Sequence, residues 1–231
     1  MTPDNPAFST FALATAACMA VTFLVCGIPF GVIIGELMGK GDIRKSGSGN
    51  IGTTNALRVG GKLVGALTLL CDVLKGLVCV VASSWVLSGL CDPSALMIFP
   101  GRGADWALSL VSLSGLAGHM FSPYLHFKGG KGIAVGFGVC MGWIWPVGLS
   151  LWIPFLAGVI ATRYVSVGSI AAAISLPLWI LLYYPGSSFA MKAVFAFMAA
   201  LVVWAHRSNI KKLMQGNESK LSFSSKKEDA R

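Results

Sequence analysis

Residues 132–162 read GIAVGFGVCMGWIWPVGLSLWIPFLAGVIAT, a stretch of 31 residues without a formal charge. A transmembrane helix takes roughly 20 apolar residues, so this stretch is too long for one straight span. Pro146 and Pro154 interrupt it, and a proline inside a helix commonly kinks or ends that helix. Whether the stretch crosses a membrane once or twice decides on which side the other loops lie, and therefore decides the fold.

The distribution of Lys and Arg favours two crossings. With a double crossing, 15 of the 18 basic residues fall on one face, and cytoplasmic loops of membrane proteins collect such residues. We therefore predict an all-α integral membrane protein, a polytopic bundle of about seven transmembrane helices with the N-terminus outside and the C-terminus in the cytoplasm. The other candidate spans are residues 10–38, 63–90, 106–122, 166–184 and 189–205.

The composition supports this class. Hydrophobic residues make up 55% of the chain, charged residues make up 12%, and the mean hydropathy is +0.74, whereas a soluble domain carries about twice that charged fraction. We assign the net charge of +9 to cytoplasmic loops and phosphate contacts rather than to nucleic acid. We expect one transmembrane domain over residues 1–210 and a polar, basic cytoplasmic tail over 211–231, disordered from residue 217 onward.

Disulfides, metals and cleavage of the N-terminus are not indicated. The six cysteines form no Cys-x-x-Cys pair and five of them lie in apolar runs, which is typical of small buried hydrophobic residues. Because no carboxylate cluster suits magnesium or zinc, we expect neither a metal nor a cofactor. The apolar run 8–20 resembles a signal sequence, but no basic residue precedes it, so we expect it to be retained as the first span.

Two features within the spans are interpreted as structural. Glycines recur every four residues from Gly27 to Gly39, and such a stripe of small residues lets a neighbouring backbone approach closely. Asp72 and Lys75 lie three residues apart in the second span, where buried charges tend to pair. We interpret them first as an ion pair that supports the fold, while a place in the functional site stays open.

The first of three polar clusters is the loop 46–58, which reads SGSGNIGTTNALR. It contains the spacing Gly-x-Gly-x-x-Gly, but a dinucleotide site needs a preceding strand, and apolar spans flank this loop. Glycine-rich backbone can turn its amides toward an anion, Arg58 can form two hydrogen bonds with a phosphate, and Ser48 adds a hydroxyl. A flexible polar connector is the alternative. The other expected phosphate contacts of this loop are Gly47, Gly49, Asn50, Gly52, Thr53, Thr54 and Asn55.

The second cluster covers residues 118–132 and ends in a basic, glycine-rich turn. Its two lysines could neutralise a dianion that also contacts the N-terminus of the following helix. The turn is not a P-loop, because no Ser or Thr follows its second lysine. Lysine side chains that reach from the interface into water are the alternative. The expected phosphate contacts here are Lys128, Gly129, Gly130, Lys131 and Gly132.

The third cluster, residues 206–212, reads HRSNIKK and follows the last span. His206 and Asn209 are three residues apart, so they would share one face of a continuing helix. Binding of anionic lipid by a basic segment beside the membrane is the alternative. Two catalytic signatures are absent from the chain, namely His with Asp five positions later and the nucleophile motif Gly-x-Ser-x-Gly.

At these segments the chain resembles the bacterial acyl-phosphate:glycerol-3-phosphate acyltransferases, the PlsY family, nearly from end to end. Two positions depart from the family pattern: Thr53 stands where Ala is usual, and Ser208 stands where an acidic residue is common. The resemblance is carried by residues 28–31 (IPFG), 42–58 (DIRKSGSGNIGTTNALR), 72–76 (DVLKG), 118–123 (GHMFSP), 127–132 (FKGGKG), 163–166 (RYVS) and 206–210 (HRSNI).

The resemblance implies a seven-helix, multi-pass enzyme of the bacterial cytoplasmic (inner) membrane, with its active site facing the cytoplasm. It implies transfer of a fatty acyl group from acyl phosphate to the 1-hydroxyl of sn-glycerol 3-phosphate, giving lysophosphatidic acid and phosphate in the first acylation of phospholipid synthesis. The expected partners are these two substrates and the lipid bilayer, without nucleic acid, and we expect a monomer. Carried over by motif position, the implied catalytic residues are Ser48, Arg58, Lys131, His206 and Asn209.

The residue types suit this chemistry. Acyl phosphate already carries a good leaving group, so positioning can supply much of the rate, on the order of 7–11 kcal/mol in well-oriented reactions. Arg58, Lys128 and Lys131 would hold the phosphates at the inner surface, while the acyl tail would lie in the bundle. Either His206 or a substrate phosphate would accept the proton of the hydroxyl, and we favour an orienting role for His206 and Asn209.

A transporter of an organic phosphate or a lipid headgroup is the alternative function. It too would need basic, glycine-rich elements in a helical bundle, but transporters typically show internal inverted repeats and a site near the membrane midplane. The chain shows no such repeat, and its polar clusters gather at one face. The acyltransferase hypothesis requires Arg58, Lys131 and His206 to share one pocket.

Overall fold

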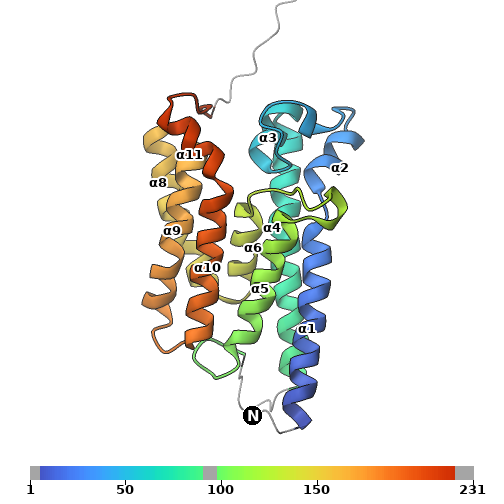
Figure 1. Cartoon of the computed structure of the whole chain (residues 1–231), viewed down its shortest axis with the longest axis vertical. Helices are drawn as coiled ribbons and strands as arrows, with labels where there is room; N and C mark the ends of the chain where they lie inside the picture. Colours follow the sequence, from blue (N-terminus) through green and yellow to red (C-terminus); the bar gives the residue numbers. More distant parts are fainter. Residues whose placement is uncertain (1–5, 91–97, 222–231) are drawn as a thin grey trace, which may run out of the picture.

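The computed structural model describes residues 6–90 and 98–221. In these residues the regular secondary structure is helical, and the long helices run side by side along the long axis of the molecule (Figure 1). The helices are α1 (Pro6–Gly27), α2 (Phe30–Leu37), α3 (Thr53–Gly60), α4 (Lys62–Gly89), α5 (Asp105–Met120), α6 (Ile133–Trp143), α7 (Trp145–Ser150), α8 (Trp152–Thr162), α9 (Val165–Tyr183), α10 (Phe189–Ala205) and α11 (Arg207–Met214), with 3-10 turns at η1 (Ile43–Lys45) and η2 (Pro123–Leu125).

Several of these helices are long and apolar enough to cross a membrane. Helices α5 and α6 are shorter, with 16 and 11 residues. The pair α10 and α11 adds one span if it is counted as a single helix bent by 51°. The predicted class, an all-helical multi-pass membrane protein, is confirmed. The segments that qualify without this pair are Ala7–Leu37, Lys62–Gly89, Trp145–Thr162 and Val165–Tyr183.

The long uncharged stretch 132–162 turns back on itself. It is divided between α6, α7 and α8, and the chain leaves the helical conformation at Ile144. Pro146 lies in the first turn of α7, where a missing backbone N–H costs least. The ring of Phe137 in α6 stacks on Trp152 in α8 with centroids 4.7 Å apart. The two arms of the stretch therefore lie against each other, and the stretch is not one straight span.

The first apolar segment is also broken. Helix α1 ends at Gly27, and α2 begins at Phe30. The glycine stripe does allow close approach here: a Cβ at Gly31 would lie 2.1 Å from the carbonyl oxygen of Ile51. The atoms that approach belong to loops as well as helices, and at Gly39 a Cβ would meet no atom within 4 Å. Gly31 and Gly35 therefore let the loop that follows α2 pack closely against this helix. Gly39 takes no part in this contact.

Helices α4 and α6 pack with their backbones almost in contact. A Cβ at Gly138 of α6 would lie 2.1 Å from the carbonyl oxygen of Val73 in α4. In return, a Cβ at Gly76 of α4 would lie 2.8 Å from the carbonyl oxygen of Val135 in α6. Small residues permit such packing where two apolar helices cross. This contact fixes the position of α6 and of the loop that precedes it.

The apolar core lies between α1, α4, α5, α6, α9 and α10. Its fully buried side chains include Val111 of α5, Cys140 of α6 and Phe195 of α10. The cysteines of the described residues carry free thiols, in line with their interpretation as small hydrophobic residues; Cys91 lies outside the described residues.

One buried carboxylate joins two loops at the end of the bundle opposite α3 (Figure 1). Asp105 is 0% exposed and accepts hydrogen bonds from the backbone N–H groups of Gly101 and Ser188, both at 2.9 Å. A buried carboxylate needs such donors. Asp105 therefore fixes the start of α5 against the start of α10.

The chain after α10 differs from the prediction. Helix α11 runs through the expected boundary at 210/211 without a break, and residues 217–221 return to the bundle. The backbone N–H of Leu221 donates to the carbonyl oxygen of Arg163 at 2.7 Å. The prediction of disorder from residue 217 onward is wrong for residues 217–221, because contacts that the local sequence does not announce hold them in place. The expected disorder of 222–231 concerns residues outside the described part of the chain.

Replacing Gly138 by Ala should lower the free energy of unfolding by about 1–3 kcal/mol relative to Gly136→Ala, because the new methyl group would overlap the backbone of α4. Gly136→Ala is a matched control on the same helix: its Cβ meets nothing within 4 Å, and it gains the same helix propensity. Thermal unfolding in detergent measures the difference. Equal midpoints for the two variants would contradict the close contact of α4 with α6.

Candidate functional site

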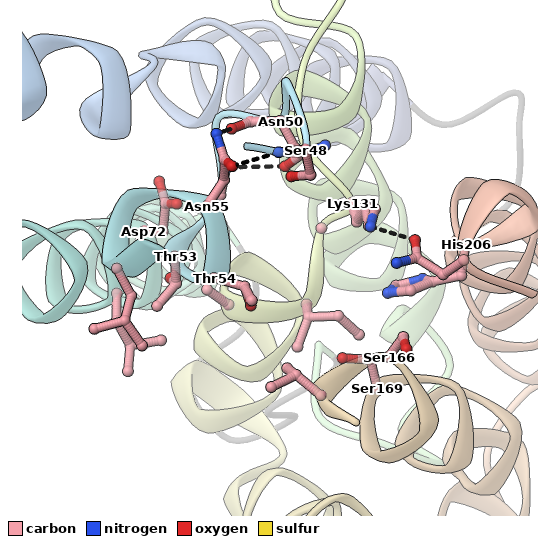
Figure 2. A pocket seen from close by; sticks show the side chains of 18 of the residues that line it. Ser48, Asn50, Thr53, Thr54, Asn55, Asp72, Lys131, Ser166, Ser169 and His206 are labelled. Carbon is pink, nitrogen blue, oxygen red and sulfur yellow. Dashed lines mark hydrogen bonds between the residues drawn. The ribbon is translucent and has the colours of Figure 1, made fainter. Parts of the chain in front are cut away.

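The three polar clusters of the sequence meet around one cavity of about 310 Å³. Figure 2 shows Ser48, Asn50 and Asn55 on one side of the cavity, Lys131 near its middle and His206 on the far side. Arg58, Lys131 and His206 therefore share one pocket, as the sequence analysis required. Its polar lining comprises Ser48, Asn50, Thr53, Thr54, Asn55, Arg58, Asp72, His119, Lys131, Ser166, Ser169, His206, Asn209, Lys212, Glu218 and Ser219, together with the backbone of Gly52 and Gly132.

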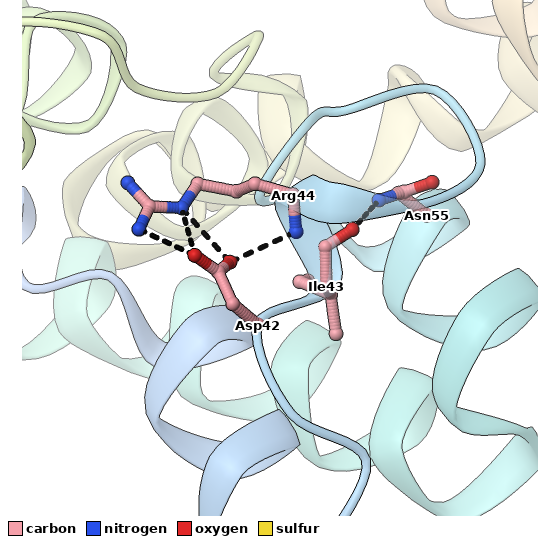
Figure 3. Close-up of polar contacts among 4 residues, drawn as sticks. All are labelled: Asp42, Ile43, Arg44 and Asn55. Atoms are coloured by element: carbon pink, nitrogen blue, oxygen red, sulfur yellow. Dashed lines mark hydrogen bonds and ion pairs between the residues drawn. The ribbon is translucent and has the colours of Figure 1, made fainter.

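Asp42 starts the first loop by capping a short turn (Figure 3). Its carboxylate accepts a hydrogen bond from the backbone N–H of Arg44 at 2.9 Å and pairs with the Arg44 guanidinium at 2.6 Å. The hydrogen bond with this guanidinium lowers the pKa of Asp42 to about 2. Arg44 is thereby bound to Asp42 at the loop surface and does not line the cavity.

Asn55 organises the rest of this loop. It is 1% exposed, and its Nδ2 donates to the carbonyl oxygens of Ile43 at 2.7 Å and Asn50 at 2.9 Å. Its Oδ1 accepts a hydrogen bond from the backbone N–H of Ser48 at 2.8 Å. The amide that was expected to contact phosphate is therefore used within the loop, and its effect is to place Ser48 at the rim of the cavity.

Two of the three glycines of this loop are needed for its backbone conformation and do not contact the cavity. Gly47 has a φ of +67°, and a Cβ there would lie 2.3 Å from Asn55 Oδ1, so only glycine fits. Gly47 and Gly49 do not line the cavity, whereas Gly52 does. Gly52 also donates its backbone N–H to Asn50 Oδ1 at 2.9 Å and directly precedes the first turn of α3, whose Thr53 and Thr54 face the cavity.

Lys131 joins the second cluster to the third. Its Nζ donates a hydrogen bond to Asn209 Oδ1. Burial is the main cause that lowers the pKa of Lys131, and the nearby charges of Lys212 and Arg58 lower it further, whereas Glu218 opposes them. Three cations thus crowd one cavity, which is the arrangement that a multiply charged anion stabilises.

The structure separates the two lysines of the second cluster. Lys131 is half-buried and lines the cavity, whereas Lys128 is exposed and lies outside the lining. Gly129 and Gly130 are also outside it; their backbone N–H groups donate back to the carbonyl oxygens of Met120 and His119, both at 3.0 Å. The expected phosphate contact of Lys128 therefore does not occur in this cavity.

His206 is buried, with 3% of its surface exposed, just beyond the end of α10. Its Nδ1 lies 2.7 Å from the carbonyl oxygen of Val202, and because a carbonyl only accepts, Nδ1 carries the proton and Nε2 is left as an acceptor. Burial lowers the pKa of His206 to about 4. The imidazole is therefore neutral at neutral pH.

Several lining residues were not among the predicted site residues. Glu218 Oε1 accepts hydrogen bonds from Asn209 Nδ2 at 2.7 Å and from Ser166 Oγ at 2.9 Å. Lys212 continues the three-residue spacing of His206 and Asn209, a signal that could have found it. Glu218 had no comparable signal, since it lies in a polar tail whose path back to the bundle depends on tertiary contacts.

Part of the cavity lining is apolar. Phe137, Trp152 and Phe155 pack against one another there, with Trp152 and Phe155 centroids 5.6 Å apart. A smaller, almost wholly apolar cavity of about 40 Å³ adjoins it and shares Gly132, Ile133 and Phe137 with it. The site therefore combines cations and amides with aromatic side chains in one cavity.

These features define a class: a helical, multi-pass membrane protein with a cationic cavity beside an apolar groove, suited to an amphipathic phosphate. The family model described as glycerol-3-phosphate acyltransferase matches residues 16–216. The chain belongs to this glycerol-3-phosphate acyltransferase family. Membership of this family rules out the alternative function, a transporter.

Curated relatives agree along most of the chain. A glycerol-3-phosphate acyltransferase of Bartonella quintana is 39% identical over 201 residues, which cover 87% of this chain and 89% of that protein. One of Rhodopseudomonas palustris is 40% identical over 205 residues, or 89% of this chain and 95% of that protein. One of Desulfotalea psychrophila is 42% identical over 200 residues, or 86% and 93%.

Two solved structures share the fold. The crystal structure of PlsY (YgiH), an integral membrane glycerol 3-phosphate acyltransferase, in its glycerol 3-phosphate form gives a TM-score of 0.77 at 31% identity. Its lysophosphatidic acid form gives a TM-score of 0.75 at 30% identity. Both comparisons cover 90% of this chain and 96% of that one.

The contrast between the two lysines can be measured. Lys131→Met should lower the acyltransferase kcat/KM at least about 100-fold, because it removes a charge from inside the cavity, whereas Lys128→Met should change it by less than about threefold. Both variants remove one lysine from the same loop. A loss of similar size in Lys128→Met would show that this cavity is not where the phosphates bind.

Proposed function

We propose that the chain transfers a fatty acyl group from acyl phosphate to the 1-hydroxyl of sn-glycerol 3-phosphate, giving lysophosphatidic acid and inorganic phosphate. The observation that carries this proposal is the convergence of Arg58, Lys131 and His206 on a cavity that is also lined by Phe137, Trp152 and Phe155. Cations are suited to the phosphates of both substrates, and an apolar groove is suited to a fatty acyl chain.

The reaction needs little covalent help from the protein. The 1-hydroxyl oxygen attacks the acyl carbonyl carbon, the bond between this carbon and the phosphate oxygen breaks, and phosphate leaves. Because acyl phosphate is a mixed anhydride, no acyl-enzyme intermediate is required. Holding both substrates in line can contribute on the order of 7–11 kcal/mol.

The cations of the cavity hold the two phosphates. Arg58 is exposed at the rim and can form paired hydrogen bonds with phosphate oxygens. Lys131 is deeper and loses its desolvation penalty when an anion binds beside it. Ser48, placed by Asn55, donates its hydroxyl to a phosphate or to the oxyanion that develops on the acyl carbonyl.

The proton of the 1-hydroxyl goes to a substrate phosphate rather than to His206. With a pKa held near 4 by burial, His206 is a weaker base than a phosphate monoester, whose second pKa is about 6. His206 Nε2 and Asn209 instead orient the hydroxyl and its phosphate.

The acyl chain lies along the apolar side of the cavity. Phe137 of α6 and Trp152 and Phe155 of α8 form its aromatic wall, and the adjoining small cavity extends it toward Cys140 and Leu151. Placing an apolar chain there removes it from water while its phosphate stays among the cations.

We place seven crossings in the bundle, with the N-terminus outside and the C-terminus in the cytoplasm of a bacterial inner membrane. The acyltransferase domain extends to residue 221 rather than 210, because Lys212, Glu218 and Ser219 line its cavity. The active site faces the cytoplasm, and the chain acts as a monomer. The reversal within 132–162 supports this topology, because it puts the loops that carry Arg58, Lys131 and His206 at one end of the bundle (Figure 1). That end also holds most basic residues, as cytoplasmic loops do.

Purified protein in detergent micelles should form lysophosphatidic acid and release phosphate from acyl phosphate and glycerol 3-phosphate. Arg58→Ala should lower this activity at least about 100-fold, because a phosphate loses its paired donor. Arg44→Ala is the matched control, since Arg44 lies in the turn η1 shortly before α3 but outside the cavity lining. It should stay within about threefold of the wild type. Absence of product in the wild type would refute the proposed reaction.

His206→Gln distinguishes orientation from proton transfer. If His206 orients glycerol 3-phosphate, its loss should raise the KM for that substrate about tenfold and lower kcat less; a base would instead lower kcat at unchanged KM. Steady-state kinetics at saturating acyl phosphate separates the two. His126→Gln, an exposed histidine outside the cavity lining, is the control. Near-normal constants for His206→Gln would remove His206 from both roles.

A further inference from the structure

Three charged or ionisable side chains are buried together on α4 and α5, next to the cavity. Asp72, Lys75 and His119 are 1%, 5% and 3% exposed. Lys75 Nζ lies 2.7 Å from Asp72 Oδ1 and 3.1 Å from His119 Nδ1. The sequence suggested an ion pair of Asp72 with Lys75, and the structure adds His119 to it. Asp72 and His119 line the cavity, whereas Lys75 does not.

Lys75 connects this cluster to the first loop. Its ammonium donates a hydrogen bond to the carbonyl oxygen of Ile28 at 2.9 Å, in the break between α1 and α2, where helical hydrogen bonding is interrupted. Helix α2 in turn supports the first loop, because Ile51 packs against Gly31 and Ile43 packs against Gly35. The direction in which α2 leaves the break therefore sets the position of Ser48 and α3.

His119 connects the same cluster to the second loop. Its carbonyl oxygen accepts the backbone N–H of Gly130 at 3.0 Å, and its ring supports Gly130 so closely that a Cβ there would lie 2.1 Å from His119 Nε2. Because the Lys75 ammonium can only donate, His119 Nδ1 accepts and Nε2 carries the proton. Gly130 directly precedes Lys131, so the orientation of the His119 ring sets the position of Lys131.

We propose that Asp72, Lys75 and His119 are positioning residues for the acyl transfer, through which one buried ammonium holds both phosphate-binding loops at a fixed separation. The inference rests on the proposed function. A purely stabilising role is a poor explanation for the cluster, because burying charges in a membrane protein is costly and apolar packing often stabilises at least as well. A catalyst that works by positioning needs its two loops fixed to within a fraction of an ångström.

Lys75→Met tests this inference, since Lys75 itself does not touch the cavity. Methionine keeps the length of the side chain but donates nothing to Ile28 or His119. We expect the KM for glycerol 3-phosphate to rise about tenfold or more and kcat to fall, in protein that is folded by circular dichroism and elutes as one species in detergent. Asp72→Asn should act in the same direction, because it removes the charge that holds the ammonium.

Asp105→Asn is the matched control. Like Asp72→Asn, it neutralises a buried carboxylate, but Asp105 lies in the first turn of α5, at the opposite end of the bundle. It should lower the midpoint of thermal unfolding while leaving KM and kcat, measured well below that midpoint, within about twofold of the wild type. A purely structural role of Lys75 would give the same pattern in Lys75→Met and would overturn the proposal.

A double-variant comparison shows whether Lys75 acts through Lys131. Lys75→Met lowers kcat/KM by some factor in the wild-type background. In a Lys131→Met background, we expect the same substitution to lower kcat/KM by less than about a third of that factor. Fully additive losses would overturn the link to the second loop.

Each failure has a distinct meaning. If Lys75→Met does not fold, Asp72→Asn decides by the same criteria, and failure of both to fold would contradict the proposal by showing that the fold itself needs the cluster. A wild-type protein without acyl transfer would refute the proposed function, whereas an active wild type with kinetically normal cluster variants would refute only the positioning role.

Discussion

The hydrogen bond from Lys131 Nζ to Asn209 Oδ1 joins two segments that lie 78 residues apart, and the site depends on it. One partner precedes α6, and the other lies on α11 beyond the last long helix. In Figure 1 α8 to α11 form one side of the bundle and α1 to α5 the other, with α6 between them. The cavity lies where these two sides meet, so its cations come from both.

Cations outnumber carboxylates in the cavity lining, which favours the binding of an anion. Arg58, Lys131 and Lys212 line the cavity together with two carboxylates. Asp72 is paired with Lys75, and Glu218 is bonded to Asn209 and Ser166. The lowered pKa of Lys131 expresses the cost of holding a buried ammonium near other cations. A phosphate placed among these groups would offset that cost, because its negative charge favours the charged form of Lys131.

The sequence predicted the path of the chain better than the direction of its side chains. The division of 132–162 followed from its length and from Pro146 and Pro154, because these features are visible in the local sequence. The three-residue spacing of His206 and Asn209 predicted that they share one face, and both line the cavity. Three features could not be predicted: Asn55 bonds within its own loop, Lys128 is exposed, and Glu218 returns to the cavity. Each depends on contacts between residues that only the folded chain brings together.

Hydrogen bonds within the protein hold the loops that surround the cavity. Asn55 bonds three segments of the first loop, and the backbone of Gly129 and Gly130 bonds to the end of α5. Such loops do not have to be ordered by the substrate, so little binding free energy is lost to their ordering. This matters for a reaction whose electrophile is already activated. When neither a covalent intermediate nor a strong protein base is needed, the rate depends on how well the hydroxyl and the acyl carbonyl are aligned, and a preformed cavity supplies that alignment.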